Sequence, residues 1–467
     1  MDSTSHPTRD RAFLALPAEL IEHIASFLPK EDLLNFRLAC RQCHRKSTAA
    51  FADAFFSTVY IDLCPPPLQR LQRIAQHDLL RRHVRTVIFA PYPETRCTNR
   101  PPEHPPNHLP GTGYHWARDP STHRLDPSDP PITTLRTSLA LLPNLRTLTV
   151  HENLGRPVEP STPDSSGLLL LDTIHIALLC AAHLPLKTFR VTQGVVDAIP
   201  MPTHPLLPCA GVLAALTPTS PWGTHLVELT LRAYPVPYGA ADAEQDALLA
   251  GLVQRAGALR RLVVLDATEG FCGLLREGGG ALPPLEVLEL RGLGTVRAEV
   301  LGGCVLRFSG TLRYLYVCYA TAGTGTEWCR MLGGWAAGLE RLRSFGVRDL
   351  RVDGMAGQGM VVFDDIARWE GGDVPEGTLT FAARHVNSRT EAVSGVRFTC
   401  AKGREGDAQR VLGKLAEVGR IVGKHRINGQ QVYDTGCTVV EKRFVIGGKL
   451  EANFSLKFNS PGLEAME

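Results

Sequence analysis

The chain has 467 residues, of which 44% are hydrophobic and 21% are charged. This composition is typical of folded globular proteins and excludes wholesale disorder. The 50 Lys and Arg residues against 47 Asp and Glu residues give a net charge of +3, so neither nucleic acid nor a membrane surface is expected as a partner. At roughly 150 residues per domain, the length predicts about three units or one elongated array.

No segment predicts export or membrane insertion. Residues 1–12 are polar and are predicted to be disordered. The most apolar stretch, Gly167–Leu186, contains Asp172, which would cost about 2.5–3.5 kcal/mol at mid-membrane, so this stretch is predicted to be a buried helix. The 12 Cys residues lack a secretory context and predict reduced thiols in a cytoplasmic or nuclear protein.

Three short helices are predicted within residues 13–57. Pro17 suits the first turn of a helix, and Pro29 ends it. A second helix begins near Glu31 or Asp32, and a third runs from Leu38 into a basic stretch at residues 41–46. The first helix carries one apolar stripe, made of Leu20, Ile21, Ile24, Phe27 and Leu28.

So few residues cannot bury enough surface to be stable alone, so the stripes need a partner. That partner is either the rest of the chain, which the helices would then cap, or another protein.

The run from Leu16 to Leu34, followed by Arg37–Arg41, resembles the F-box over about Phe13 to Thr48. Cys43 departs from the family, which often has Trp there. The resemblance implies docking on the Skp-type adaptor of a cullin–RING ubiquitin ligase. It also implies a set of matching contact or core positions: Leu16, Pro17, Leu20, Ile21, Ile24, Leu33, Leu34 and Leu38.

A six-residue pattern, apolar-x-x-apolar-x-apolar, recurs along the rest of the chain. The last two apolar positions of the pattern are separated by one residue, and this alternation predicts a half-buried strand. Helical stretches lie between several copies, and such long connections predict that the strands are parallel, because antiparallel neighbours would need only a tight turn. Eight clear copies begin at Val84, Leu145, Leu186, Leu226, Leu259, Leu285, Leu312 and Leu342, and Val393–Phe398 is a weaker ninth.

This region resembles an irregular leucine-rich-repeat array, although the family's Asn occurs only once, as Asn153. An ordinary α/β domain is the alternative. The predicted fold class is therefore α/β, with an N-terminal three-helix F-box followed by an irregular leucine-rich-repeat-like solenoid of parallel strands and helices. After the F-box, the predicted divisions are a linker helix and first repeat strand (58–89), a Pro- and His-rich loop or disordered insertion (90–131), the array (132–377), and C-terminal strands and a helix that form a possible cap (378–467).

Strand positions between the buried apolar ones are predicted to face solvent, among them Thr149 and Glu289. Tyr and Arg are the side chains most often found at binding hot spots. The candidate contacts for a target protein are therefore Arg261, Arg291, Tyr314, Tyr316 and Arg348.

No motif indicates catalysis, a metal or a cofactor. Cys40-x-x-Cys43-His44 matches a haem-attachment pattern but lies in a predicted helix. Gly292-x-Gly294 begins like a dinucleotide fingerprint, but Arg297 replaces its third Gly. A non-catalytic substrate-recognition subunit of an SCF-type ligase, bound to a Skp-type adaptor, a cullin scaffold and an unknown target, is thus the favoured function. The alternative is a protein-binding scaffold that uses the F-box for assembly without ubiquitination.

Overall fold

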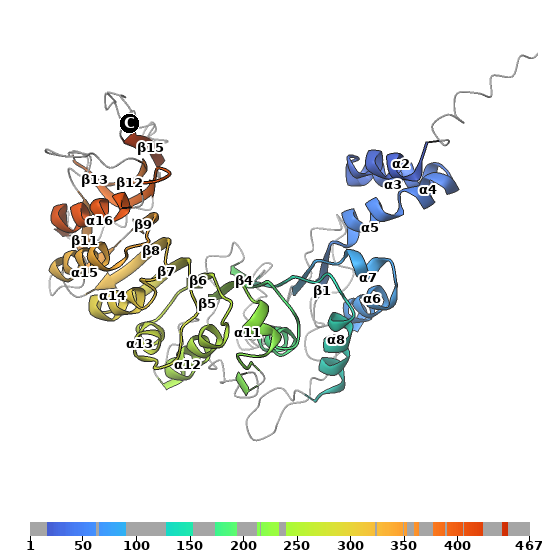
Figure 1. Cartoon of the computed structure of the whole chain (residues 1–467), viewed down its shortest axis with the longest axis horizontal. Coiled ribbons are helices and arrows are strands. Elements are labelled where there is room, and N and C mark those ends of the chain that lie inside the picture. Colours follow the sequence, from blue (N-terminus) through green and yellow to red (C-terminus); the bar gives the residue numbers. More distant parts are fainter. Residues whose placement is uncertain are drawn as a thin grey trace, which may run out of the picture. The chain divides into compact units, whose positions relative to one another are not determined.

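The computed structural model describes residues 16–61, 65–89, 128–152, 173–193, 213–214, 216–232, 240–322, 325–348, 350–352, 359–363, 377–387, 390–404, 406–423 and 441–446. The chain forms two compact units, Met1–Ala322 and Gly323–Glu467, which are taken one at a time (Figure 1). The predictions made for residues 1–12 and for Asn153 lie outside the described residues. So does most of the predicted loop or disordered insertion over 90–131, but its last two residues, Pro130 and Pro131, already belong to a helix.

Four helices open the described part of the first unit. They are α2 (Ala18–Ser26), α3 (Lys30–Ala39), α4 (Arg41–Lys46) and α5 (Thr48–Phe56). Pro17 and Pro29 cap the first two, as their missing N–H groups allow. The predicted start of the third helix at Leu38 is wrong, because α3 continues to Ala39 and Cys40 takes an extended conformation that separates α3 from α4.

These four helices share a small core of their own. Ala25, Leu33 and Ala50 are buried at its centre. Side chains from α3 and α5 pack around them, among them Phe36 and Phe51. The helix α5 was not predicted as a separate element, and it supplies much of the apolar surface that the first three helices lack.

Eight parallel strands follow in chain order, each beside the next (Figure 1). They are β1 (Thr58–Ile61), β2 (Thr86–Phe89), β3 (Thr147–Glu152), β4 (Thr188–Gln193), β5 (Glu228–Arg232), β6 (Arg261–Leu265), β7 (Val287–Thr295) and β8 (Tyr314–Ala322). The pattern predicted all of them except β1. The predicted α/β class, with helical N-terminus and parallel strands, is confirmed.

Helices connect successive strands of this sheet. They are α6 (Pro65–Gln76), α7 (Leu80–His83), α8 (Pro130–Ala140), residues 173–181, α11 (Pro221–His225), α12 (Ala240–Arg255), α13 (Glu269–Glu277) and α14 (Ala298–Leu306). The helices α12, α13 and α14 pack in succession along one side of the strands (Figure 1). The buried helix predicted over Gly167–Leu186 is confirmed for residues 173–181, but the helix ends there and residues 182–186 lead into β4.

The repeated pattern places its apolar side chains in the core. All three apolar positions of all eight clear copies are at most 2% exposed. A ladder of main-chain bonds joins the copies, because one carbonyl before each strand accepts the N–H groups of two residues in the next copy. The accepting carbonyls belong to Ser57, Arg85, Arg146, Lys187, Val227, Arg260 and Glu286. These bonds satisfy the buried main chain where an Asn ladder is missing.

The second unit contains α15 (Gly325–Gly338), β9 (Ser344–Arg348), β10 (Arg351–Val352), β11 (Gly359–Phe363), β12 (Gly377–Asn387), β13 (Thr390–Cys400), α16 (Asp407–Val418), β14 (Gly419–Gly423) and β15 (Glu441–Ile446). Its strands pair antiparallel in the orders β9-β13-β12-β15 and β10-β11-β14. The weak copy at Val393–Phe398 therefore does not continue the parallel repeat. The helix predicted within residues 378–467 is found as α16.

Candidate functional site

Large apolar side chains are exposed on the first two helices. Of the ten such side chains in the described part of the chain that are at least 40% exposed, five lie between residues 20 and 38. Leu20, Ile24 and Phe27 follow one face of α2 and are 49%, 40% and 74% exposed. Leu34 and Leu38 follow one face of α3 and are 42% and 82% exposed. These five side chains are called the apolar stripes below.

The opposite faces of the same helices point inward. Ile21 and Ala25 of α2 are fully buried, and Leu33 of α3 is 1% exposed. Each helix therefore carries two apolar faces, of which the four-helix core can cover only one. The stripes are the face that this chain leaves open.

The eight residues that the F-box resemblance singled out divide between these two faces. Ile21 and Leu33 belong to the core. Pro17 is exposed, and Leu16 is half-buried with its carbonyl accepting a bond from Lys46. The four that point outward are Leu20, Ile24, Leu34 and Leu38. Phe27, which was not among the eight, is more exposed than all of them but Leu38, and its place in the i, i+4, i+7 series was the signal for it.

Arg37 fixes α3 against the following helices. It is 9% exposed, and its guanidinium donates to the His44 carbonyl at 3.1 Å and lies 4.0 Å from the ring centre of Phe51. Desolvation by burial lowers the pKa of Arg37. Farther along, Asp53 of α5 pairs with Arg85 at 2.8 Å, just before β2. The stripes are thus presented on a frame that is tied to the parallel sheet.

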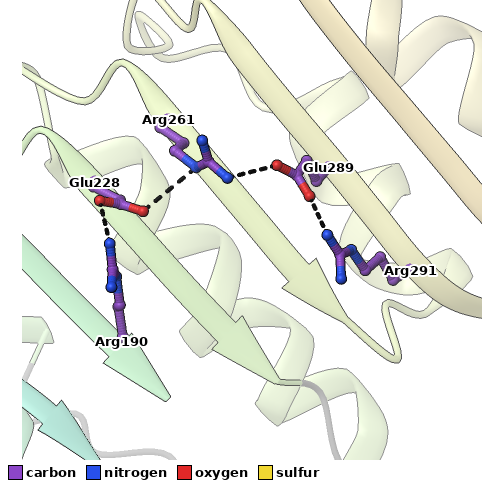
Figure 2. A network of polar contacts seen from close by, with 5 residues as sticks. All are labelled: Arg190, Glu228, Arg261, Glu289 and Arg291. Atoms are coloured by element: carbon purple, nitrogen blue, oxygen red, sulfur yellow. Dashed lines mark hydrogen bonds and ion pairs between the residues drawn. The ribbon is translucent and has the colours of Figure 1, made fainter. Parts of the chain in front are cut away.

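A second surface, which is polar, lies across four strands of the sheet (Figure 2). Glu228 accepts from Arg190 at 2.9 Å and contacts Arg261 at 3.4 Å. Glu289 accepts from Arg261 at 2.7 Å and from Arg291 at 2.6 Å. These five side chains, called the charge ladder, alternate in sign from β4 to β7 and hold three Arg against two Glu.

Two side chains predicted to face solvent on this sheet are buried. Glu289 is 4% exposed because the two Arg side chains that bind it extend over it. Thr149 is 6% exposed because it lies between Ile88 and Arg190 of the adjacent strands, whose side chains are longer. Simple alternation along a strand cannot predict this covering by neighbours.

The structure brings together four of the five candidate target contacts. Arg261 and Arg291 have side chains that are 45% and 49% exposed. The Arg291 guanidinium lies 5.5 Å from the ring centre of Tyr316, and Tyr314 is on the same face of β8. Desolvation acts to lower the pKa of Arg291, but the hydrogen bond and charge of Glu289 raise it on balance. Arg348 lies on β9, in the second unit.

The Gly292-x-Gly294 motif does not form the turn of a dinucleotide fingerprint. Gly292 and Gly294 lie within β7 with φ of +68° and +58°, rather than in a strand-to-helix turn. A Cβ at position 292 would lie 2.4 Å from Asp266 Oδ1. Over the residues that the structure covers, we find no cluster of three potential metal-binding side chains and no helix both long and apolar enough to cross a bilayer.

Comparison with known families identifies an F-box domain at residues 13–48. This interval contains α2, α3 and α4, and therefore all of the apolar stripes. The domain implies a Skp-type adaptor as a partner. A search of the curated proteins found no match to the chain.

Proposed function

We propose that this chain is the substrate-recognition subunit of an SCF-type ubiquitin ligase. Its F-box binds the Skp-type adaptor, and through it the cullin scaffold, while the sheet surface holds a target protein. The observation that carries this proposal is the pair of apolar stripes on α2 and α3, because they remain exposed after the chain has covered the other face of both helices.

Exposed apolar residues scattered singly over a protein surface need no explanation. Here half of the strongly exposed large apolar side chains among the described residues fall within a segment of 19 residues, Leu20–Leu38. Docking of an apolar partner surface would remove these side chains from water. At about 1.5–3 kcal/mol for each fully buried side chain, the exposed fractions amount to roughly 4–9 kcal/mol of available burial.

The proposed adaptor contacts are the outward residues of the F-box: Leu20, Ile24, Phe27, Leu34, Leu38 and Pro17. Leu16, which is half-buried, lies at the edge of this set. Ile21 and Leu33 support the contact from within the core and do not touch the adaptor.

For the target, the proposed surface is the exposed part of the charge ladder together with the tyrosines of β8. Arg261, Arg291, Tyr314 and Tyr316 present guanidinium and aromatic groups on one face, a chemistry that is common at protein hot spots. Arg348 is a further proposed contact on the second unit. We propose that the parallel array is leucine-rich-repeat-like, in view of its buried pattern and main-chain ladder.

In this role the chain supplies no reactive group and needs no cofactor. It raises the effective concentration of the target beside the ubiquitin carrier, which is catalysis by proximity alone. We propose a cytoplasmic or nuclear location, where such complexes act.

The test is co-purification of the full chain with a purified Skp-type adaptor. A double substitution, Leu20→Asp and Ile24→Asp, places two charges in the apolar contact and should abolish binding. Leu141→Asp is the matched control, because Leu141 is 41% exposed but lies beyond the F-box, at the end of α8. Retention of the adaptor by the double variant would overturn the proposal.

Ubiquitination can then be separated from assembly alone. Target proteins captured by the unchanged chain should have longer half-lives in cells that carry the double variant. If the unchanged chain binds the adaptor but the target half-lives are the same in cells with the unchanged chain and in cells with the double variant, the chain is a scaffold rather than a ligase subunit.

A further inference from the structure

Two cysteines meet at the junction of α3 and α4. Cys40 is the residue that caps α4, and its backbone is extended, with φ of −164° and ψ of 164°. This conformation turns its side chain back over the first turn of the helix, where the N–H of Cys43 donates to Cys40 Sγ at 3.3 Å. Cys40 Sγ therefore already lies against the main chain of Cys43 before any reaction.

The two thiols differ in access and in acidity. Cys40 is partly exposed, whereas Cys43 is 4% exposed. Hydrogen bonds from the N–H and thiol of Cys43 lower the pKa of Cys40, because they stabilise its thiolate. Burial raises the pKa of Cys43. Cys40 is thus the thiol that a reagent from solution reaches as a thiolate. Cys43 is the buried thiol that reacts second.

We propose that Cys40 and Cys43 are a redox-active pair that closes to an intrachain disulfide by exchange with a low-molecular-weight disulfide such as oxidised glutathione. The Cys40 thiolate attacks one sulfur of the reagent, forms a mixed disulfide and releases one glutathione thiolate. Cys43 then loses its proton and attacks the Cys40 sulfur, which expels the second glutathione. The chain loses two protons and two electrons, and one disulfide reagent is reduced to two thiols.

The local geometry allows the second step without rebuilding the helices. A disulfide needs Cα atoms within about 4.4–6.8 Å, and the capping contact already brings Cys40 Sγ against the main chain of Cys43. Closing the bond requires rotation of the two side chains about the existing turn.

Another cysteine pair in the same unit provides an internal control. A hydrogen bond with the Cys304 thiol of α14 and burial raise the pKa of Cys272 of α13 well above its ordinary value, and the two side chains are 1% and 0% exposed. A thiolate has to form and meet its reagent for exchange to begin, so this buried pair should stay reduced under conditions that oxidise Cys40 and Cys43.

The test treats the full-length, folded chain with oxidised glutathione, stops the exchange with acid, alkylates the remaining thiols and locates them by peptide mass spectrometry. The expected result is a Cys40–Cys43 disulfide that dithiothreitol reverses, with Cys272 and Cys304 still alkylated. Alkylation of both Cys40 and Cys43 at the same level as in an untreated sample would overturn the proposal.

Two near-isosteric variants test the assigned order of attack. Cys43→Ser should accumulate glutathione on Cys40, because the second step is missing. Cys40→Ser should leave Cys43 unmodified. A glutathione adduct on Cys43 in the second variant, or none on Cys40 in the first, would contradict the roles given to the two thiols. Adaptor binding does not enter this measurement, so it stands apart from the test of the proposed function.

Discussion

Replacing each of two adjacent leucines on α3 by alanine should affect different properties. Leu33→Ala should lower stability, and Leu34→Ala should weaken adaptor binding. Leu33 is 1% exposed in the core of the N-terminal helices, and Leu34 is 42% exposed on the apolar stripe. Leu33→Ala leaves a cavity, so it should lower the free energy of unfolding by about 2–5 kcal/mol. Leu34→Ala removes only the packing of a partly exposed side chain and should lower that free energy by about 1 kcal/mol or less.

Adaptor affinity should show the reverse dependence. Burial of the exposed part of Leu34 is worth about 1 kcal/mol, so Leu34→Ala should weaken adaptor binding by about fivefold. Leu38 is 82% exposed, and Leu38→Ala should cost about 2 kcal/mol, or about thirtyfold in affinity. These figures assume that the adaptor covers both side chains completely.

The assays are urea unfolding followed by circular dichroism for stability, and isothermal titration calorimetry with purified adaptor for affinity. Leu141→Ala is the control for exposure, since Leu141 is 41% exposed outside the F-box. Leu34→Ala and Leu38→Ala variants that bind the adaptor as tightly as the unchanged chain would refute the reasoning, because the stripes would then contribute nothing to the contact.

Two further predictions concern the parallel sheet. Glu289→Gln should lower stability by about 1–3 kcal/mol, because it removes the charge that Arg261 and Arg291 share at a nearly buried site. Glu286→Gln, at a side chain that is 37% exposed with ion pairs at 3.5 and 3.7 Å, should change it by less than about 1 kcal/mol, and equal losses in urea unfolding would contradict the argument. Gly292→Ala should destabilise the chain more than Gly294→Ala in the same assay. Both positions have positive φ, which costs a residue with a Cβ about 1–2 kcal/mol. Only at position 292 would the Cβ also meet a carboxylate, that of Asp266, which Arg232 holds at 2.6 Å. A larger loss at 294 would show that strain, not the Asp266 contact, dominates.

The repeated pattern predicted most of the parallel sheet because its signal is strong and local. Each copy brings three apolar residues at fixed spacing, and burial of all three leaves little choice of conformation. The strand β1 was missed although Phe56, Val59 and Ile61 have the same spacing as the other copies, with Phe56 as the last residue of α5. The pattern also could not predict the strand direction at Val393–Phe398, because the same apolar spacing occurs in parallel and in antiparallel strands.

The sequence located the F-box but not which of its faces points outward. Leu33 and Leu34 are equally apolar neighbours, and only the packing of α5 against α2 and α3 decides which of them is covered. For the charge ladder, the sequence predicted the exposure of the Arg residues but not the burial of Glu289. That burial depends on registers between strands that lie far apart in the sequence.

The central claim is that the exposed faces of α2 and α3 are covered by a Skp-type adaptor. Amide hydrogen–deuterium exchange of the full chain, with and without purified adaptor, tests it directly. The account predicts slower exchange on adaptor binding in α2 and α3, with β4 to β7 unchanged. Unaltered exchange in both helices while the adaptor is bound would contradict it.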